Sequence, residues 1–382
     1  MNRATGTYAT STTLGESVRA FVPHPLPPAD PPLAAASFTD LNRQAELALA
    51  RLSGVSGLVP SVDWLLYSAV RKEALLTSQI EGTQATLTDL FDEEAGFKVS
   101  NTDDVAEVTN YLRAFRLVRE QLRDPKGLPI SGRLLCDAHR LLLDGARGAG
   151  KQPGEPRHSQ NWIGGTRPGN AVFVPPPPER VPELLSSLER FIHGEAGDLP
   201  PLVKIALIHA QFETIHPFLD GNGRIGRLLI GALLEHWNLL VEPLMYLSGY
   251  LKQHQAEYYR RLSVIRTEGD WESWVSFFLE AVAVAAADAE RGIIAIASLI
   301  AADRRKLLQS SKASPATYRL FERLPMMPRF TVERARQQLD TTFPTANAAV
   351  RVLEQLDVVV EVTGQKKNRS YSYQAYVDLL TR

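Results

Sequence analysis

The residues of this chain that could do chemistry gather in one short segment, 216–227, which reads HPFLDGNGRIGR. Pro217 cannot continue the helix that is expected to end near Thr214, so a short loop should follow, and a strongly apolar helix is predicted from Arg224. Glycines before a helix let backbone amides approach a ligand, and the free N–H groups and the helix dipole favour an anion. Arg224 and Arg227 lie three residues apart on one face, which suits a polyphosphate.

Two further side chains of this segment suit phosphoryl or nucleotidyl transfer. Asp220 offers the hard carboxylate that a magnesium-bound phosphate requires, and His216 can accept a proton near neutral pH. Each feature alone more often has a structural role, because loop histidines and Gly-Asn-Gly turns usually only shape the chain. Together within twelve residues they predict a phosphoryl- or nucleotidyl-transfer site.

The composition is that of an ordinary globular protein with two or three domains, since 44% of the 382 residues are hydrophobic. A formal charge of −1 argues against a whole-molecule attraction to nucleic acid and leaves a local basic patch open. The single cysteine, Cys136, excludes an intramolecular disulfide and is expected to be buried. The N-terminus lacks a signal-peptide pattern, and no stretch reaches the ~18 apolar residues of a membrane span. We expect a cytoplasmic protein without membrane contact.

The chain is expected to be mainly α-helical around the segment 216–227. Residues 1–35 predict a Pro-rich extended arm, 36–110 an N-terminal helical region, 111–300 the core, and 301–382 a linker followed by a small domain. Two pieces near 160–163 and 171–174 predict a β-hairpin with a Gly-rich turn. The remaining core helices are expected at about 103–123, 131–144, 180–193, 201–214, 224–237, 253–267 and 271–301.

The C-terminal region predicts a winged helix. After a linker near 301–315, three helices are expected at about 316–323, 331–339 and 345–356, followed by two strand-like runs joined by a basic turn with Lys366, Lys367 and Arg369. Such a module contacts DNA or another protein, and the sequence leaves both open.

The segment resembles the signature HPFx(D/E)GNGRxxR of the Fic (Fic/Doc) family at every fixed position. TSQIEG at 77–82 resembles the inhibitory motif of that family, (S/T)xxxE(G/N). GEPRHSQNWIGG and AVFVPPPP resemble the hairpin flap that holds the target, and EYYRRLSVIRTEGDW resembles the helix that closes the adenine side. The resemblance covers about 35–285 and implies a Fic-type helical bundle with a β-hairpin flap.

It also implies a protein adenylyltransferase, which moves AMP from ATP with Mg²⁺ onto a Ser, Thr or Tyr hydroxyl of a target protein or of itself. His216 would be the general base and Asp220 the metal ligand. Arg224 would contact the β-phosphate and Arg227 the γ-phosphate. The nucleotide-binding set implied by the resemblance is Gly221, Asn222, Gly223, Arg224, Ile225, Gly226, Arg227, Tyr258 and Tyr259.

The resemblance further makes Glu81 an inhibitory residue that pairs with Arg227 in the place of the γ-phosphate. In some members the same glutamate helps to remove AMP, so this second activity is included. Arg266 stands where the family often has Asn, which leaves the adenine contacts open. In the flap, Ile163 to Gly165 are expected to offer main-chain groups to a target, and Arg157 and Trp162 are interpreted as structural supports.

Three alternatives remain at this point. A relative could transfer another phosphate-containing group, but the intact GNGRIGR favours a triphosphate. The chain could be a nucleotide-sensing, DNA-binding regulator, which the predicted wing supports. An antitoxin-like partner with an idle site is disfavoured because His216 and Asp220 are present. A homodimer is compatible with the sequence, which specifies no interface.

Overall fold

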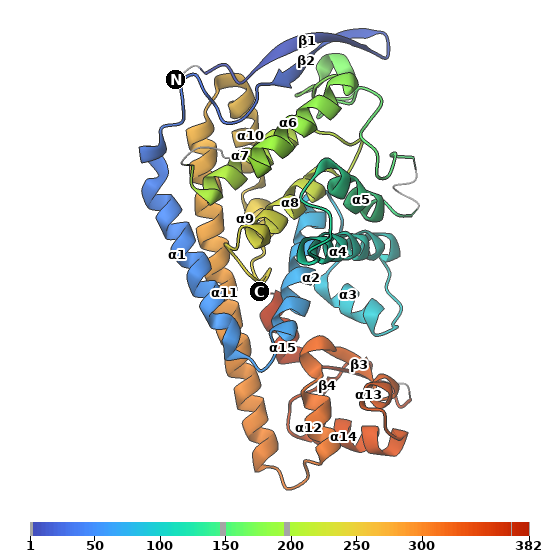
Figure 1. Ribbon diagram of the computed structural model, residues 1–382. Coiled ribbons are helices and arrows are strands. Elements are labelled where there is room, and N and C mark those ends of the chain that lie inside the picture. Colours follow the sequence, from blue (N-terminus) through green and yellow to red (C-terminus); the bar gives the residue numbers. More distant parts are fainter. Residues whose placement is uncertain (1–2, 146–149, 195–198, 368, 382) are drawn as a thin grey trace.

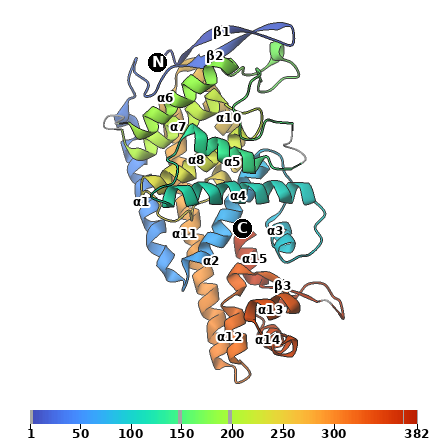
Figure 2. The same ribbon diagram turned by 45° about the vertical axis from the view of Figure 1, so that its right-hand side comes forward.

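The computed structural model describes residues 3–145, 150–194, 199–367 and 369–381, and helices dominate these residues (Figure 1). Two long helices, α1 (Thr39–Val55) and α11 (Trp271–Gln309), run side by side along one edge. Figure 2 shows that α11 continues beyond the main body and carries the C-terminal unit at its end. The mainly α-helical fold expected from the sequence is confirmed.

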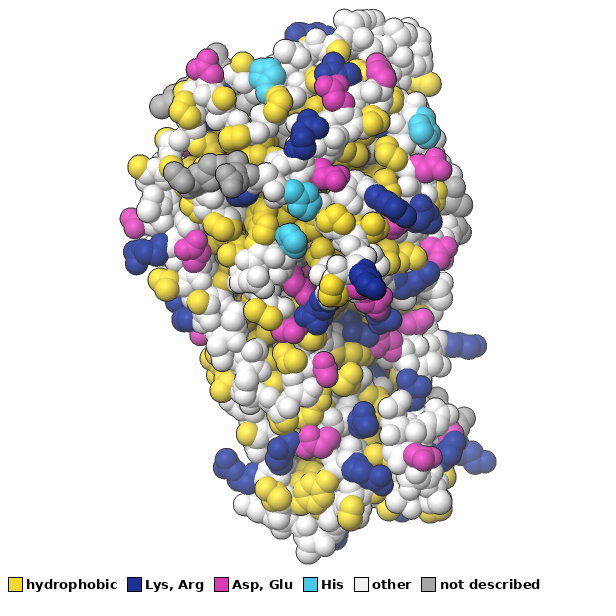
Figure 3. Space-filling view, in the orientation of Figure 1, with side chains coloured by type: hydrophobic (Ala, Val, Ile, Leu, Met, Phe, Trp, Pro, Cys, Tyr) yellow, Lys and Arg dark blue, Asp and Glu magenta, His cyan; other side chains and the backbone are white. Residues whose placement is uncertain are grey.

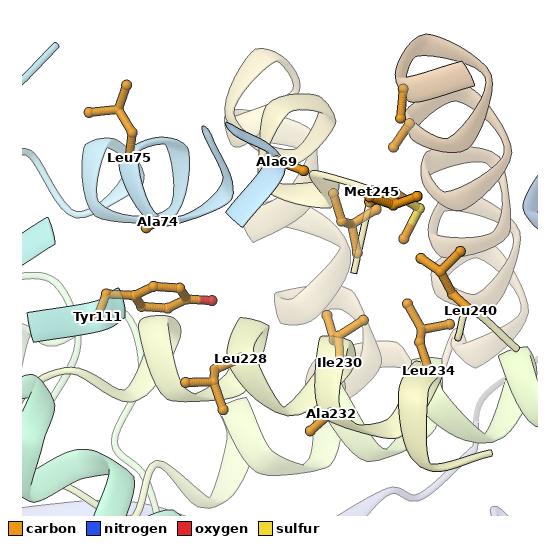
Figure 4. Close-up of a cluster of buried hydrophobic side chains, with 14 of the residues drawn as sticks. Ala69, Ala74, Leu75, Tyr111, Leu228, Ile230, Ala232, Leu234, Leu240 and Met245 are labelled. Carbon is orange, nitrogen blue, oxygen red and sulfur yellow. The ribbon is translucent and has the colours of Figure 1, made fainter. Parts of the chain in front are cut away.

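The centre of the main body is a pair of helices, α7 (Pro201–Ile215) and α8 (Asn222–His236). Almost every residue of α7 is buried, because the helix is apolar on all sides and other helices surround it. An apolar layer joins α8 to α2 (Val62–Ile80), with Leu228 and Ile230 on one side, Ala74 on the other and the ring of Tyr111 between the helices (Figure 4). The core is completed by α3 (Leu87–Glu94), α4 (Thr102–Arg123), α5 (Gly132–Leu142), α6 (Val181–His193), α9 (Leu247–Gln253) and α10 (Gln255–Glu268).

The N-terminal arm forms a β-hairpin that the sequence did not predict. Strands β1 (Gly6–Thr13) and β2 (Glu16–Pro23) pair antiparallel, and both turn residues, Leu14 and Gly15, have positive φ. Such a turn suits hairpins, but Leu-Gly lacks the usual Asn-Gly signal and so escaped notice. The hairpin lies on the flap, where the Phe21 N–H donates to the carbonyl of Val174 (2.9 Å).

The flap itself is less regular than the predicted hairpin. Its two arms meet in a single bridge between Ile163 and Phe173, and a 3₁₀ turn at Pro168–Asn170 closes the tip. Part of the preceding segment, 146–149, lies outside the described residues. At the tip of the flap, Gly165 has φ +72, and a Cβ on this residue would come within 2.5 Å of the Asn170 carbonyl oxygen. The tip therefore needs glycine at this position.

Two predictions from local composition are wrong. The linker expected from residue 301 is helical up to Gln309, because Asp303 and Leu307 of α11 are buried against the C-terminal unit. Only 310–314 connect the two units. Cys136, expected to be buried, is half-buried, since it lies off the apolar face of α5.

The C-terminal unit contains the three predicted helices and a three-stranded antiparallel sheet with the order β3-β5-β4. A further helix, α15, replaces the end of the second predicted strand and lies near α2 in both views. The winged-helix class and DNA contact stay predictions. The elements are α12 (Pro315–Phe321), β3 (Arg329–Thr331), α13 (Val332–Leu339), α14 (Phe343–Gln355), β4 (Val360–Glu361), β5 (Ser370–Ser372) and α15 (Gln374–Thr381).

No helix within the described ranges combines the length and apolar character needed to cross a membrane.

Candidate active site

His216 closes the C-terminus of α7 in an unusual backbone conformation. Its φ and ψ are 49° and 62°, in the left-handed region, and its N–H donates to the carbonyl of Phe212 (2.9 Å). This region is rare for a residue other than glycine, and the residue before a proline is normally extended. His216 precedes Pro217, so the turn is strained on both counts. Strain of this kind persists where surrounding contacts hold it, and it clusters at functional sites.

The loop after His216 is held by Asn222, whose side chain makes two hydrogen bonds to one residue. Its Oδ1 accepts from the Phe218 N–H and its Nδ2 donates to the Phe218 carbonyl, both at 2.8 Å. The side chain predicted to bind phosphate is therefore engaged in the loop, which leaves the Asn222 backbone amide for a ligand. Gly221 precedes α8 with φ +75, and in the described residues no side chain caps the first turn of α8. The helix thus begins with the uncapped amides that bind anions.

His139 of α5 packs against the same loop, although the sequence analysis did not identify it. Its ring stacks on Phe218 with the centroids 3.8 Å apart. Because its Nδ1 accepts from the Gly154 N–H (3.0 Å), its Nε2 must carry the proton that is donated to the Asp220 carbonyl (3.0 Å). Burial lowers the pKa of His139 to about 4, so this neutral form is kept at pH 7.

Arg227 faces the C-terminal end of α2. Its guanidinium pairs with the Glu81 carboxylate, and it also donates to the Thr77 hydroxyl (2.6 Å) and the Thr77 carbonyl (3.1 Å). Burial, the largest single influence, would raise the pKa of Glu81, but the charge and hydrogen bond of Arg227, together with Arg224 and His216, outweigh it and hold that pKa below its usual value. A Cβ on Gly223 would come within 2.4 Å of the Glu81 carboxylate, so Glu81 lies directly on the first turn of α8.

Arg224 also has a carboxylate from the N-terminal region. Its guanidinium lies 3.3 Å from Glu107 of α4 and 3.7 Å from Asp220. The Arg224 side chain is 6% exposed, whereas that of Asp220 is 47% exposed. The Asp220 oxygens are therefore accessible beside the helix N-terminus and fit a hard cation such as Mg²⁺. The described residues contain no group of three metal-ligating side chains, so phosphate oxygens would have to complete the coordination of such a metal.

His216 lies in a mixed environment that keeps its imidazole neutral. Burial and the nearby charge of Arg157 lower the pKa of His216 to about 4. Glu213, one turn earlier on α7, is half-buried with its Oε1 enclosed against Gly226, and desolvation raises its pKa to about 7. A neutral imidazole next to an anion-binding helix start can accept a proton from a nucleophile.

The remaining predicted residues are not all at the ligand side. Ile225 is completely buried, and Gly226 lies where α7 and α8 approach closely, since a Cβ there would meet Phe212 at 3.2 Å. Tyr258 is also fully buried, and its hydroxyl donates to His209 Nε2 (2.8 Å) while His209 Nδ1 donates to the Gly226 carbonyl (3.2 Å). Tyr258 therefore supports α8 from the core.

Tyr259 and Arg266 of α10 lie closer to the site. Tyr259 is 45% exposed, and burial together with the charge of Glu81 raises its pKa. The Arg266 guanidinium stacks over the ring of Phe173 in the flap, 3.7 Å from the centroid, and lies near Glu213. Arg266 therefore contacts the flap, and Tyr259 lies near the pair of Glu81 and Arg227.

In the flap, the backbone groups of Ile163 are hydrogen-bonded to the other arm of the flap. Its N–H donates to the Phe173 carbonyl (2.8 Å), and its carbonyl accepts from the Val172 N–H (3.0 Å). Trp162 packs against the N-terminal hairpin as a support. Sequence reasoning missed His139 and Glu107, because each reaches the loop from a helix about 80 or more residues earlier. No local spacing marks such contacts.

The fold and this loop define a helical protein in which an uncapped helix N-terminus, of the kind that can bind phosphate, lies beside a histidine that can accept a proton. The comparisons with protein families agree with this class. The "Fic/DOC family N-terminal" model matches residues 39–120 and the "Fic/DOC family" model matches 129–234. The chain therefore carries the N-terminal region and the Fic domain of the Fic/DOC family.

Curated relatives match over part of their length. A probable protein adenylyltransferase of Aquifex aeolicus is 43% identical over 70 residues, which is 18% of this chain and 22% of the relative. Protein adenylyltransferase Fic of Drosophila melanogaster is 34% identical over 133 residues, 33% of this chain and 23% of the relative. The chain thus matches less than a quarter of the length of these relatives.

Solved structures share the fold over more of the chain. A Fic family protein of Desulfovibrio desulfuricans superposes with a TM-score of 0.57 at 21% identity, covering 90% of this chain and 97% of that one. Fic-1 of C. elegans gives a TM-score of 0.50 at 22% identity, covering 67% of this chain and 72% of that one.

Proposed function

We propose that this chain is a protein adenylyltransferase that transfers AMP from ATP to a hydroxyl of a protein. A single observation carries the proposal: His216, Asp220, Arg224 and Arg227 meet on one loop and the first turn of one helix. The names of the matched relatives point to the same reaction.

The reaction follows from these positions. The oxygen of a Ser, Thr or Tyr hydroxyl attacks the α-phosphorus, the bond from that phosphorus to the bridging oxygen breaks, and pyrophosphate leaves. His216 accepts the hydroxyl proton, which contributes about 10²–10⁴-fold. The uncapped amides at the start of α8 bind the α- and β-phosphates, and the two arginines bind the β- and γ-phosphates. Asp220 would hold Mg²⁺, which would supply positive charge next to the leaving pyrophosphate.

The contact between Glu81 and Arg227 supports autoinhibition within the same proposal. The Glu81 carboxylate pairs with the Arg227 guanidinium. In the proposed reaction the same guanidinium binds the γ-phosphate of ATP. ATP in its productive pose must displace Glu81. The same carboxylate, next to the loop, is placed to orient water in the removal of AMP, and this reverse activity is part of the proposal.

The proposal is tested by self-modification. Wild-type, Glu81→Gly and Glu81→Gly/His216→Ala proteins are incubated with ATP and Mg²⁺, and intact mass is measured. We expect the mass of one or more AMP groups on Glu81→Gly, less on wild type and none on Glu81→Gly/His216→Ala. Modification that survives His216→Ala would overturn the role of the base. If Glu81→Gly carries no AMP, the same series is repeated with candidate protein substrates, and no transfer there would reject the proposal.

A further inference from the structure

Arg157 is a buried arginine that contacts the candidate base through the backbone. It is 1% exposed, and its pKa is lowered to about 10 because burial disfavours its charge. It forms no ion pair within the part of the chain that the structure describes. A charge buried in this way is costly unless hydrogen bonds satisfy it, and here all acceptors are backbone carbonyls.

These carbonyls come from three segments. The Arg157 Nε donates to the carbonyl of His216 (2.9 Å), and one terminal nitrogen donates to Pro176 (2.5 Å) and, at 3.5 Å, to Ile215. The other terminal nitrogen reaches Ser159 at 3.4 Å. Its backbone N–H adds a bond to the carbonyl of Pro217 (2.8 Å). One planar fork thus joins the first arm of the flap, its last residues and the end of α7, which a lysine cannot do.

The turn that Arg157 holds is the strained one. His216 has a left-handed backbone before a proline, and its imidazole Nδ1 is buried with no hydrogen-bond partner in the described ranges. The orientation of the ring therefore depends on the backbone, and the His216 carbonyl is fixed by Arg157. A small displacement of a catalytic group lowers the rate by about 10²-fold.

We propose that Arg157 is the positioning residue of the base, which locks the left-handed turn at His216 to both ends of the flap. This inference rests on the proposed function. Arg157 therefore fixes both the flap, on which a target would dock, and the position of the His216 base. Arg157 is almost fully enclosed and bonded to the His216 carbonyl, so in this proposal it acts through His216.

The positive charge of Arg157 gives the proposal a signature that a purely structural role lacks. The charged groups around the imidazole are Arg157 from the flap, Glu81 at the end of α2 and Arg266 from α10, and the backbone of Glu213 on α7 adds a hydrogen bond that raises the pKa of His216. Burial lowers the pKa of His216 most, and the charge of Arg157 has the next largest effect, also lowering it. Removing its charge should therefore raise the pKa of the imidazole, whereas Arg157→Lys should leave it low.

The test compares Arg157→Lys and Arg157→Met in the Glu81→Gly protein. Arg3→Met is the matched control, because Arg3 is also buried and donates to three backbone carbonyls, far from the loop. The readouts are the single-turnover rate, ATP affinity by calorimetry, and the pKa of the His216 imidazole by NMR. The NMR readout needs no activity, so it separates failure of this inference from failure of the proposed function.

Both Arg157 variants should lose about 100-fold or more in rate while ATP affinity stays within about threefold. The pKa of His216 should rise toward its ordinary value in Arg157→Met only. Arg3→Met should lose stability without loss of rate. The proposal is overturned if Arg157→Lys keeps the wild-type rate, if ATP affinity falls in parallel with the rate, or if the imidazole pKa is unchanged in Arg157→Met. Should Arg157→Met fail to fold, the rate and ATP affinity of Arg157→Lys decide.

Discussion

At the scale of single residues, the decisive property of His216 is that its imidazole stays uncharged. A general base acts only when it is unprotonated, so activity is present above its pKa and lost as the pH falls through it. Because the pKa of His216 is lowered to about 4, kcat/KM of the Glu81→Gly protein should stay level down to about pH 5.

The pKa of Glu213 is raised to about 7, so this carboxyl could also titrate in the same pH range. Measuring kcat/KM against pH in both the Glu81→Gly and the Glu81→Gly/Glu213→Gln proteins separates the two titrations. Circular dichroism at each pH controls for unfolding. A half-maximal rate near the ordinary imidazole value of ~6.5 in both proteins would contradict the lowered pKa of the base.

The pair of Glu81 and Arg227 makes a second prediction at this scale. Glu81→Ala leaves a buried guanidinium without its carboxylate, which should lower the free energy of unfolding by about 1–3 kcal/mol. ATP supplies phosphate oxygens in its place, so ATP with Mg²⁺ should raise the melting temperature more in Glu81→Ala than in wild type.

Glu272→Ala is the matched control, because Arg3 and Glu272 form an ion pair with similar burial away from the loop. It should lose stability and gain nothing extra from ATP. Equal gains with ATP in wild type and Glu81→Ala would show that Glu81 does not compete with the nucleotide.

At the scale of elements, the site depends on how closely α7 and α8 approach. Gly226 lies at the contact, and a Cβ there would come within 2.4 Å of Glu213 and 3.2 Å of Phe212. Gly226→Ala should therefore lower the free energy of unfolding by about 1–3 kcal/mol in urea denaturation. In the same helix, Gly231 has open space around it, so Gly231→Ala should stabilise by up to about 1 kcal/mol. The same sign for both variants would contradict this packing.

The sequence predicted the elements that carry strong local signals. The loop from His216 to Arg227 is contiguous, so its glycines, arginines and carboxylate could be interpreted together, and most core helices were placed from their apolar spacing. The contacts that complete the site were not predictable, because Arg157, His139 and Glu107 reach it from distant segments. Residues 301–309 were misjudged because only the presence of the C-terminal unit explains why Asp303 and Leu307 are buried.

At the scale of the whole molecule, the C-terminal unit packs on the core through specific polar contacts. The Tyr373 hydroxyl donates to Asp303 of α11 (2.8 Å), and Arg329 pairs with Asp92 of α3 (2.6 Å). Tyr373→Phe should lower the free energy of unfolding by about 1–2 kcal/mol, because Asp303 is buried and loses a donor. A double-mutant cycle with Asp303→Ala by urea denaturation measures this coupling, and a coupling near zero would refute it.

The surface of the molecule fits a net charge of −1. Acidic and basic side chains are interspersed over the face shown in Figure 3. On this face, recognition of the proposed protein target would therefore rest on local geometry more than on a strong overall field.

The central claim, transfer of AMP, is tested most directly by following the two ends of ATP. The Glu81→Gly protein is incubated with Mg²⁺ and ATP labelled on either the α- or the γ-phosphate, together with Glu81→Gly/His216→Ala as control. The account predicts label on protein from the α-phosphate alone, abolished by His216→Ala. Retention of the γ-label would contradict it and identify a phosphate-transferring enzyme.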